Sequence, residues 1–183
     1  NFLNLLQLKK IDNMSIGSNK LNILDLSNCS LLEKILFAAF SNNQIKQLKL
    51  PKNIAIIGNF SFQHNQIESL DLSNYTNLKN IASYIFEGNQ IKHIKLSQSL
   101  EIIYYNAFEN NKIEILDLSN CIKLKNIGEC AFEKNPLNEI KILNNVNIYY
   151  DKDDKYKEDK WNIFTKYYND NGKKSGDYKY END

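Results

Sequence analysis

The chain has 183 residues, of which 42% are hydrophobic and 25% are charged, and its formal net charge is +1. This balance is typical of one folded domain with an apolar core, and it lacks the basic surplus of a nucleic-acid-binding protein. No apolar stretch is long enough to cross a membrane. From the charge balance we expect no nucleic-acid partner, and from the missing apolar stretch we expect no membrane insertion by this segment. No signal peptide is present, but the chain starts at Asn1 within an incomplete repeat. We therefore expect a piece of a longer protein.

Residues 1–18 are interpreted as a partial N-terminal repeat. Leu8, Ile11 and Ile16 occupy positions that hold large apolar residues in later repeats, whereas the fit before Leu8 is poor. An end repeat exposes apolar core unless another unit covers it. We expect either more chain or self-association through this N-terminal end to provide that cover.

Clear repeats follow, and their lengths alternate between 24 and 22 residues. They span residues 19–42, 43–64, 65–88, 89–110 and 111–134, a sixth begins at Asn135, and the whole repeat region is residues 19–143. Such periods, with leucine at fixed offsets, are typical of leucine-rich repeats. In NKIEILDLSNCIKL the LxxLxLxx(N/C) pattern is carried by Ile113, Leu116, Leu118 and Cys121.

Each repeat contains two apolar groups. In the first, leucines alternate with polar residues, which predicts short half-buried strands that lie side by side and parallel in successive repeats. The second, for example Leu78, Ile81 and Phe86, should return along the outer face as a turn or short helix.

A phenylalanine also recurs ahead of an asparagine near the end of each repeat. The pairs are Phe40 and Asn43, Phe62 and Asn65, Phe86 and Asn89, Phe108 and Asn111, and Phe132 and Asn135. An asparagine amide can both donate to and accept from the backbone of a tight turn. The spacing therefore predicts a stacked phenylalanine spine beside a stacked asparagine ladder.

The repeats resemble the leucine-rich repeats of BspA-like bacterial surface proteins. The resemblance rests on NQIESLDLSN and on the IxxxAF motifs of residues 103–108 and 127–132, and it covers about residues 8–143. It implies an α/β fold: a right-handed, curved solenoid with a parallel sheet on the concave side and short turns or helices on the convex side. The family is associated with cell-surface proteins, some of them adhesins, and the resemblance supplies no catalytic residues.

Residues 144–183 break the repeat pattern and are expected to cap the array with a helix and a short strand. Trp161, Phe164 and Tyr168 have helical spacing. Tyr178 and Tyr180 alternate with a lysine, which predicts the strand. The block WNIFTKYYNDNGKKSGDYKY is also similar to the ends of some BspA-like chains, and its aromatic residues suit a cover for the last repeat.

Charged residues are expected to line the open face of the sheet in two columns. The first column reads Asp25, Lys49, Asp71, Lys95, Asp117 and Lys141, and the second contains Lys46, Glu68, Lys92 and Glu114 between two asparagines. Both columns alternate in sign, which predicts a cross-strand charge ladder that favours pairing a 24-residue repeat with a 22-residue repeat. The alternative is a zwitterionic face for a charged or sugar-like partner. The ladder and the binding face are compatible interpretations, because the charged groups of the ladder stay exposed to solvent.

A third column on the same face is less regular, so it is the better place to look for specificity. It reads Ile23, Gln47, Ser69, His93, Ile115 and Glu139. His93 is a candidate binding residue, although a solvent-facing histidine without a role is the plainer interpretation. His64 is interpreted as a loop residue.

The cysteines give no sign of a disulfide or a zinc site. Cys29 and Cys121 occupy the same position in repeats that lie roughly 19 Å apart, which is too far for a disulfide. Buried thiols are therefore expected. Cys130 shares its position with Phe60 and Tyr84, which indicates a tolerant outer position.

No motif for catalysis or for a cofactor occurs. The chain lacks GxSxG, P-loop and GxGxxG sequences, and no histidine stands at a recognisable spacing from serine and aspartate. Asp151, Asp153 and Asp154 could suggest calcium, but interleaved lysines and the missing glycine and distal glutamate favour a solvated loop. We expect no metal and no cofactor.

The sequence therefore predicts a non-enzymatic binding module of a bacterial cell-surface or secreted protein. It would bind a protein or glycan on a host or neighbouring cell, as in adhesion, through the charged columns and His93. The alternative is an intracellular scaffold that holds a protein partner with the same face. An enzyme would need a catalytic domain outside these residues.

Overall fold

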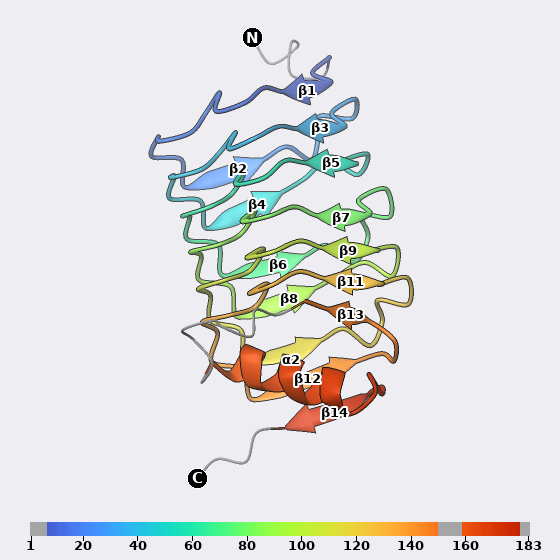
Figure 1. The fold of residues 1–183 in the computed structure, drawn as a ribbon. Coiled ribbons are helices and arrows are strands. Elements are labelled where there is room, and N and C mark those ends of the chain that lie inside the picture. Colours follow the sequence, from blue (N-terminus) through green and yellow to red (C-terminus); the bar gives the residue numbers. More distant parts are fainter. Residues whose placement is uncertain (1–6, 150–158, 180–183) are drawn as a thin grey trace.

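The structure, a computed structural model, describes residues 7–149 and 159–179. The chain winds into a stack of similar turns, and most turns contribute one strand to each of two faces (Figure 1). We name one face the front face, although it is the more distant one in Figure 1. It contains β2 (Ile23–Asp25), β4 (Gln47–Lys49), β6 (Ser69–Asp71), β8 (His93–Lys95), β10 (Ile115–Asp117) and β12 (Glu139–Ile142). The back face contains β1 (Lys10–Ile11), β3 (Lys34–Ile35), β5 (Ile56–Ile57), β7 (Asn80–Ile81), β9 (Ile102–Ile103), β11 (Asn126–Ile127) and β13 (Asn147–Ile148).

The front strands are the half-buried strands that the alternation predicted. In β6, for example, Leu70 is buried between exposed Ser69 and Asp71. Parallel hydrogen bonding joins these strands in groups, β2 with β4, β6 with β8, and β10 with β12. The first two pairs each join a 24-residue repeat to the following 22-residue repeat. The hydrogen-bonded ladder is interrupted between β4 and β6 and between β8 and β10.

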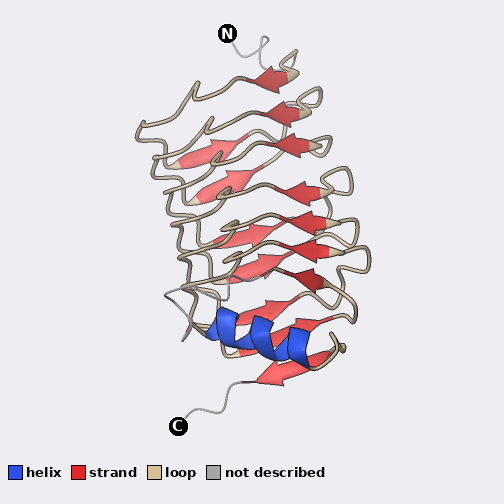
Figure 2. Cartoon of the chain, viewed as in Figure 1, coloured by secondary structure: helices blue, strands red, loops and turns tan. Residues whose placement is uncertain are grey.

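The back face differs from the prediction of a turn or short helix for the second apolar group. The turns are present, but a two-residue strand precedes each of them, and within the described residues the only helix is the C-terminal one, at the end of the stack (Figure 2). The back strands form two parallel sheets, β1-β3-β5 and β7-β9-β11-β13. The backbone stays extended here because its amides are satisfied by the neighbouring turns and need no helical hydrogen bonds. Gly58 N, for example, donates to Ile35 O at 2.8 Å.

The core contains the predicted phenylalanine spine. Phe40, Phe62, Phe86, Phe108 and Phe132 are fully buried. Successive rings are stacked, with centroids 5.2 to 5.6 Å apart. The indole of Trp161 continues the row, with its centroid 4.9 Å from that of Phe132. The spine therefore joins the repeats to the C-terminal helix in one hydrophobic core.

The asparagine ladder is confirmed beside this spine. Asn65 Nδ2 donates to the carbonyl oxygens of Phe40 and Phe62, at 3.0 and 3.2 Å, and its Oδ1 accepts from Ile45 N at 2.9 Å. Equivalent bonds are made by Asn43, Asn89, Asn111 and Asn135. Each amide thus satisfies buried backbone groups of its own turn and of the preceding turn.

The C-terminal part has the helix and the strand that the aromatic spacing predicted. Helix α2 (Lys160–Asp170) buries Trp161, Phe164 and Tyr168. Strand β14 (Gly176–Lys179) pairs antiparallel with β12. Tyr180 of the predicted strand lies outside the described residues.

Candidate functional site

The front face places the residues of the first predicted column in register across its strand pairs. Asp25 is opposite Lys49, Asp71 is opposite Lys95, and Asp117 is opposite Lys141. Lys49 Nζ lies 3.3 Å from Asp25 Oδ2. Among the described residues, neither of the other two register pairs lies within 4.0 Å, and Lys141 Nζ lies 3.4 Å from Glu139 Oε1 instead.

A continuous ladder, in which each lysine lies between two carboxylates of hydrogen-bonded strands, is therefore not formed. The interruptions in the front sheet separate the register pairs from one another. The alternation of charge produces three local pairs, of which one is an ion pair by distance. Exposed pairs of this kind contribute only about 0–1 kcal/mol to stability.

Each aspartate of the column has a second role that the sequence interpretation missed. Asp71 Oδ1 accepts from the backbone N and the Oγ of Ser73, at 3.0 and 2.6 Å. The same bonds join Asp25 to Ser27 and Asp117 to Ser119. The hydrogen bonds from serine are the main cause that lowers the pKa of Asp25 and Asp71. The recurring Asp-x-Ser sequence was the available signal, because it is typical of a turn in which the side chain accepts from the backbone.

A hollow of about 790 Å³ opens on the front face where β8 and β10 are not hydrogen bonded to each other. It contains half of the predicted binding residues, namely Lys92, His93, Lys95, Glu114 and Asp117. Asp25, Lys49, Glu68, Asp71 and Lys141 lie on the front face but do not line this hollow.

The hollow combines charges of both signs with exposed apolar surface. Lys92 and Lys95 come from the β8 side, and Lys112, Glu114 and Asp117 come from the β10 side. The lining also includes two isoleucines, Ile115 with 56% and Ile122 with 67% of its surface exposed. Large aliphatic side chains this exposed, among five charged groups, indicate a surface suited to contact with another molecule.

The described residues provide no site for a metal ion. No group of three or more histidine, cysteine or acidic side chains that could hold a metal is found in residues 7–149 and 159–179. His64 lies at a corner, with Nε2 3.6 Å from Glu87 Oε2, whereas His93 is the first residue of β8 on the front face. The acidic loop with Asp151, Asp153 and Asp154 lies outside the described residues.

The cysteines are present as thiols and form no disulfide. Cys29 and Cys121 are buried, as expected, and burial raises the pKa of the Cys121 thiol to about 11. Cys130 is half-buried. No helix in the described part of the chain is long and apolar enough to span a membrane.

The back face carries a row of aromatic rings that the sequence interpretation did not identify. Phe37, Phe60, Tyr84 and Tyr105 follow one another with centroids 4.7 to 5.4 Å apart. The row changes repeat position: Phe60 and Tyr84 share the position of Ala38, whereas Phe37 and Tyr105 each stand one residue earlier in the repeat. This change of position hid the row from an alignment of the repeats.

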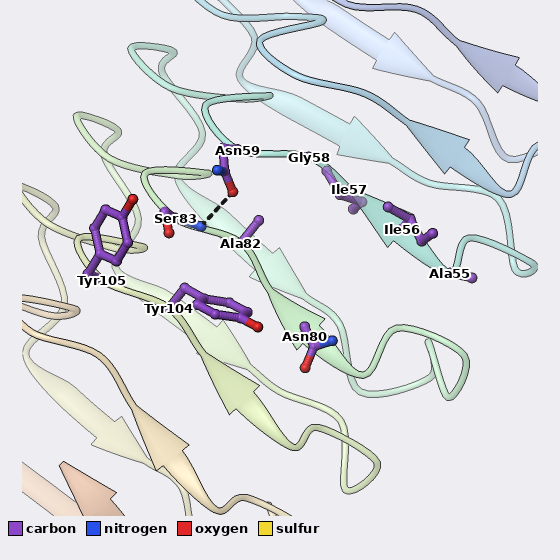
Figure 3. A pocket seen from close by; sticks show the side chains of 10 residues that line it. All are labelled: Ala55, Ile56, Ile57, Gly58, Asn59, Asn80, Ala82, Ser83, Tyr104 and Tyr105. Atoms are coloured by element: carbon purple, nitrogen blue, oxygen red, sulfur yellow. Dashed lines mark hydrogen bonds between the residues drawn. The ribbon is translucent and has the colours of Figure 1, made fainter. Parts of the chain in front are cut away.

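A hollow of about 490 Å³ lies beside this row, between β5 and β7 (Figure 3). Its lining includes Ile56, Asn80, Ala82, Tyr104 and Tyr105. The Tyr104 ring extends from its chain toward Ala82 and Asn80. The molecule therefore has a charged hollow on the front face and a second hollow, with aromatic side chains, on the back face.

Comparisons with known proteins identify the family. The profile described as "BspA type Leucine rich repeat region" matches residues 9–123 and 33–152, with six copies. A solved structure, the crystal structure of a leucine-rich repeat protein from Bacteroides ovatus ATCC 8483, is 18% identical over 78% of this chain and 49% of that chain, with a TM-score of 0.43. No curated protein matches the sequence. Because the matched residues make up more than half of the chain, the chain belongs to the BspA-type leucine-rich repeat family.

Proposed function

We propose that this chain is a non-enzymatic binding module that holds a protein partner on its front face, at the hollow between β8 and β10. One observation carries the proposal: this hollow gathers Lys92, Lys95, Glu114 and Asp117 around two strongly exposed isoleucines. Protein interfaces combine an apolar centre with a polar rim, and opposed charges fix the orientation of the partner.

The mixed charge favours a protein over other macromolecules. A nucleic acid would be met by a surplus of lysine and arginine, but two carboxylates lie among the lysines of this hollow. A polypeptide supplies both signs of charge and aliphatic side chains within a few residues. The stacked repeats hold these groups on a regular framework, so little ordering accompanies binding.

We further propose that the module belongs to a bacterial cell-surface or secreted protein and serves adhesion to a host or neighbouring cell. The family resemblance supports this location. The alternative is an intracellular scaffold that uses the same hollow. The presence of three thiols without a disulfide is compatible with it.

The location is tested by antibody labelling of intact and lysed cells of the source organism. We expect labelling of intact cells. Labelling that appears only after lysis would contradict the surface proposal and favour the scaffold.

The binding face is tested with a partner captured from the accessible compartment and then purified. We expect Lys95→Glu and Ile122→Ser each to weaken binding at least about tenfold, because they reverse a charge or remove apolar surface in the hollow. Lys34→Glu is the matched control, since Lys34 is an exposed lysine on β3 of the back face. Equal affinities for the Lys95 variant and the Lys34 variant would refute the assignment of the hollow.

A further inference from the structure

The back-face hollow is built from small residues at a break in the sheet. Gly58 and Ala82 occupy the position that holds Leu36 and Tyr104 in neighbouring repeats, so no large side chain fills the space between β5 and β7. A Cβ on Gly58 would lie 2.8 Å from Phe37 N, so the backbones of these two turns approach each other closely there. Asn59 Oδ1 accepts from Ser83 N at 3.2 Å and joins the two sides of the break (Figure 3).

Apolar and aromatic side chains at this hollow are open to solvent. Ile56 is 48% exposed, Tyr104 is 41% exposed and Tyr105 is 47% exposed. Tyr104 and Tyr105 also line a second hollow, of about 380 Å³, which lies over Gly128 and extends to Tyr149. Tyr104 therefore stands between two adjacent hollows.

Among the residues that the structure describes, the lining of the first hollow contains no charged residue, although charged residues make up 25% of the chain. Its polar groups are neutral: the amides of Asn59 and Asn80, the hydroxyl of Ser83 and the tyrosine hydroxyls. Of the described residues that line the second hollow, one is acidic, Glu129. This composition contrasts with the front-face hollow, and it matches a ligand that has no net charge, apolar faces and polar edges.

A sugar ring has this chemistry. One face of a pyranose presents C–H bonds, which pack against the electron-rich face of an aromatic ring. Its hydroxyl groups lie at the edge of the ring, where amides and hydroxyls can donate to them and accept from them. Charged side chains are not required for a neutral sugar, and a charged partner would find no counter-charge in the first hollow.

We propose that the back face binds a neutral glycan chain, with sugar residues in the two hollows and Tyr104 between them. The centres of the hollows are two strand spacings apart, or about 10 Å. A short oligosaccharide can span this distance, whereas a single sugar cannot. This site is on the opposite face from the proposed protein site, so the two proposals are independent and are tested separately.

The experiment is native affinity electrophoresis of the purified chain in gels that contain one polysaccharide each. The neutral probes are a soluble β-glucan, a xylan, a mannan and a galactan, and the acidic probe is polygalacturonate. We expect retarded migration with at least one neutral probe and none with polygalacturonate. An oligosaccharide of the retarding polysaccharide then gives a dissociation constant by calorimetry.

The variants separate the site from the rest of the surface. Tyr104→Ala should weaken binding at least about tenfold, because an aromatic platform is lost, whereas Tyr104→Phe should retain most of the affinity. Tyr167→Ala is the matched control, since Tyr167 is a comparably exposed tyrosine on α2. Ala82→Leu should also abolish binding by filling the hollow, and it should fold, since Leu36 occupies the same position in an earlier repeat.

Thermal unfolding of every variant confirms that only folded protein is compared. Equal affinities for Tyr104→Ala and Tyr167→Ala would overturn the proposal. Retardation by polygalacturonate alone, or by no neutral probe, would overturn it as well.

Discussion

Asn89 Nδ2 donates to the carbonyl oxygen of Phe62, 2.9 Å away and 27 residues earlier in the chain. The same nitrogen donates to Phe86 O at 3.1 Å, and Asn89 Oδ1 accepts from Ile67 N at 3.0 Å. One buried side chain therefore satisfies backbone groups of two successive turns. The bonds couple the turns to one another, and that coupling is what a repeat without its own closed core requires.

Replacing Asn89 by leucine should destabilise the chain strongly. The substitution keeps the volume similar but leaves Ile67 N without its partner in a buried corner, whereas the carbonyl oxygens of Phe62 and Phe86 keep their bonds from neighbouring asparagines. An unsatisfied buried polar group costs about 1–3 kcal/mol, and the free energy of unfolding should fall by roughly this amount. Urea denaturation measures this change. Gln90→Leu, at the exposed neighbouring residue, should change stability by less than about 0.5 kcal/mol; similar losses in both variants would contradict the ladder's role.

The phenylalanine spine and the asparagine ladder could be predicted because they recur at fixed positions in the sequence. The register of Asp71 with Lys95 followed from the same periodicity. The interruptions of the front sheet agree with the expected pairing of a 24-residue repeat with a 22-residue repeat, but the hollows at the breaks could not be predicted, since they depend on how far successive turns separate in space. The charged hollow and the hollow beside Tyr104 arise at such breaks, so only the structure places them.

Asp71 should tolerate asparagine better than lysine. An asparagine oxygen can still accept from Ser73 N, whereas lysine removes this turn and adds a positive charge opposite Lys95. The difference between the two variants should be about 1 kcal/mol at low salt and should shrink at high salt, where exposed charges are screened. Equal melting temperatures for the two variants would show that neither the turn nor the charge pair matters for stability.

The wild-type chain should also lose part of its stability in acid through Asp71. Hydrogen bonds from Ser73 lower the pKa of this carboxyl, so the folded state favours the ionised form. The stabilisation is present above the pKa of the unfolded chain, and it disappears as the pH falls through the lower pKa of the folded chain, below about pH 4. Ser73→Ala should show a weaker pH dependence in this range. An unchanged pH profile would refute the assignment.

Gly128 should not tolerate a side chain. A Cβ there would lie 2.8 Å from the carbonyl carbon of Tyr104 and closer still to Tyr105 N, so the backbone of the preceding turn would have to move. Gly128→Ala should lower the free energy of unfolding by about 1–3 kcal/mol. Gly176→Ala is the control, because the nearest atom to its Cβ would be Tyr178 Cε2 at 3.6 Å. A Gly128 variant as stable as the Gly176 variant would contradict the close approach of these turns.

Asp159 caps the N-terminus of α2 and also ties the helix to the repeats. Its Oδ1 accepts from Trp161 N and its Oδ2 accepts from Lys134 N, both at 2.8 Å. Burial raises the pKa of this carboxyl, and the backbone hydrogen bonds only partly oppose that effect. The charge is therefore partly desolvated, whereas the two hydrogen bonds are favourable.

Substitutions at Asp159 should separate the charge from the hydrogen bonds. Asp159→Ala removes the cap and should cost about 1–2 kcal/mol. Asp159→Asn keeps one acceptor for the helix without the buried charge, so it should be clearly more stable than the alanine variant at pH 7. Because the folded pKa is raised, wild-type stability falls as the pH rises from the unfolded value through the folded value. The free energy of unfolding of the asparagine variant, relative to that of the wild type, should therefore be higher at pH 7 than at pH 3. Urea denaturation at both pH values decides this, and an asparagine variant no more stable than the alanine variant at pH 7 would rule out the capping bond as the source of stability.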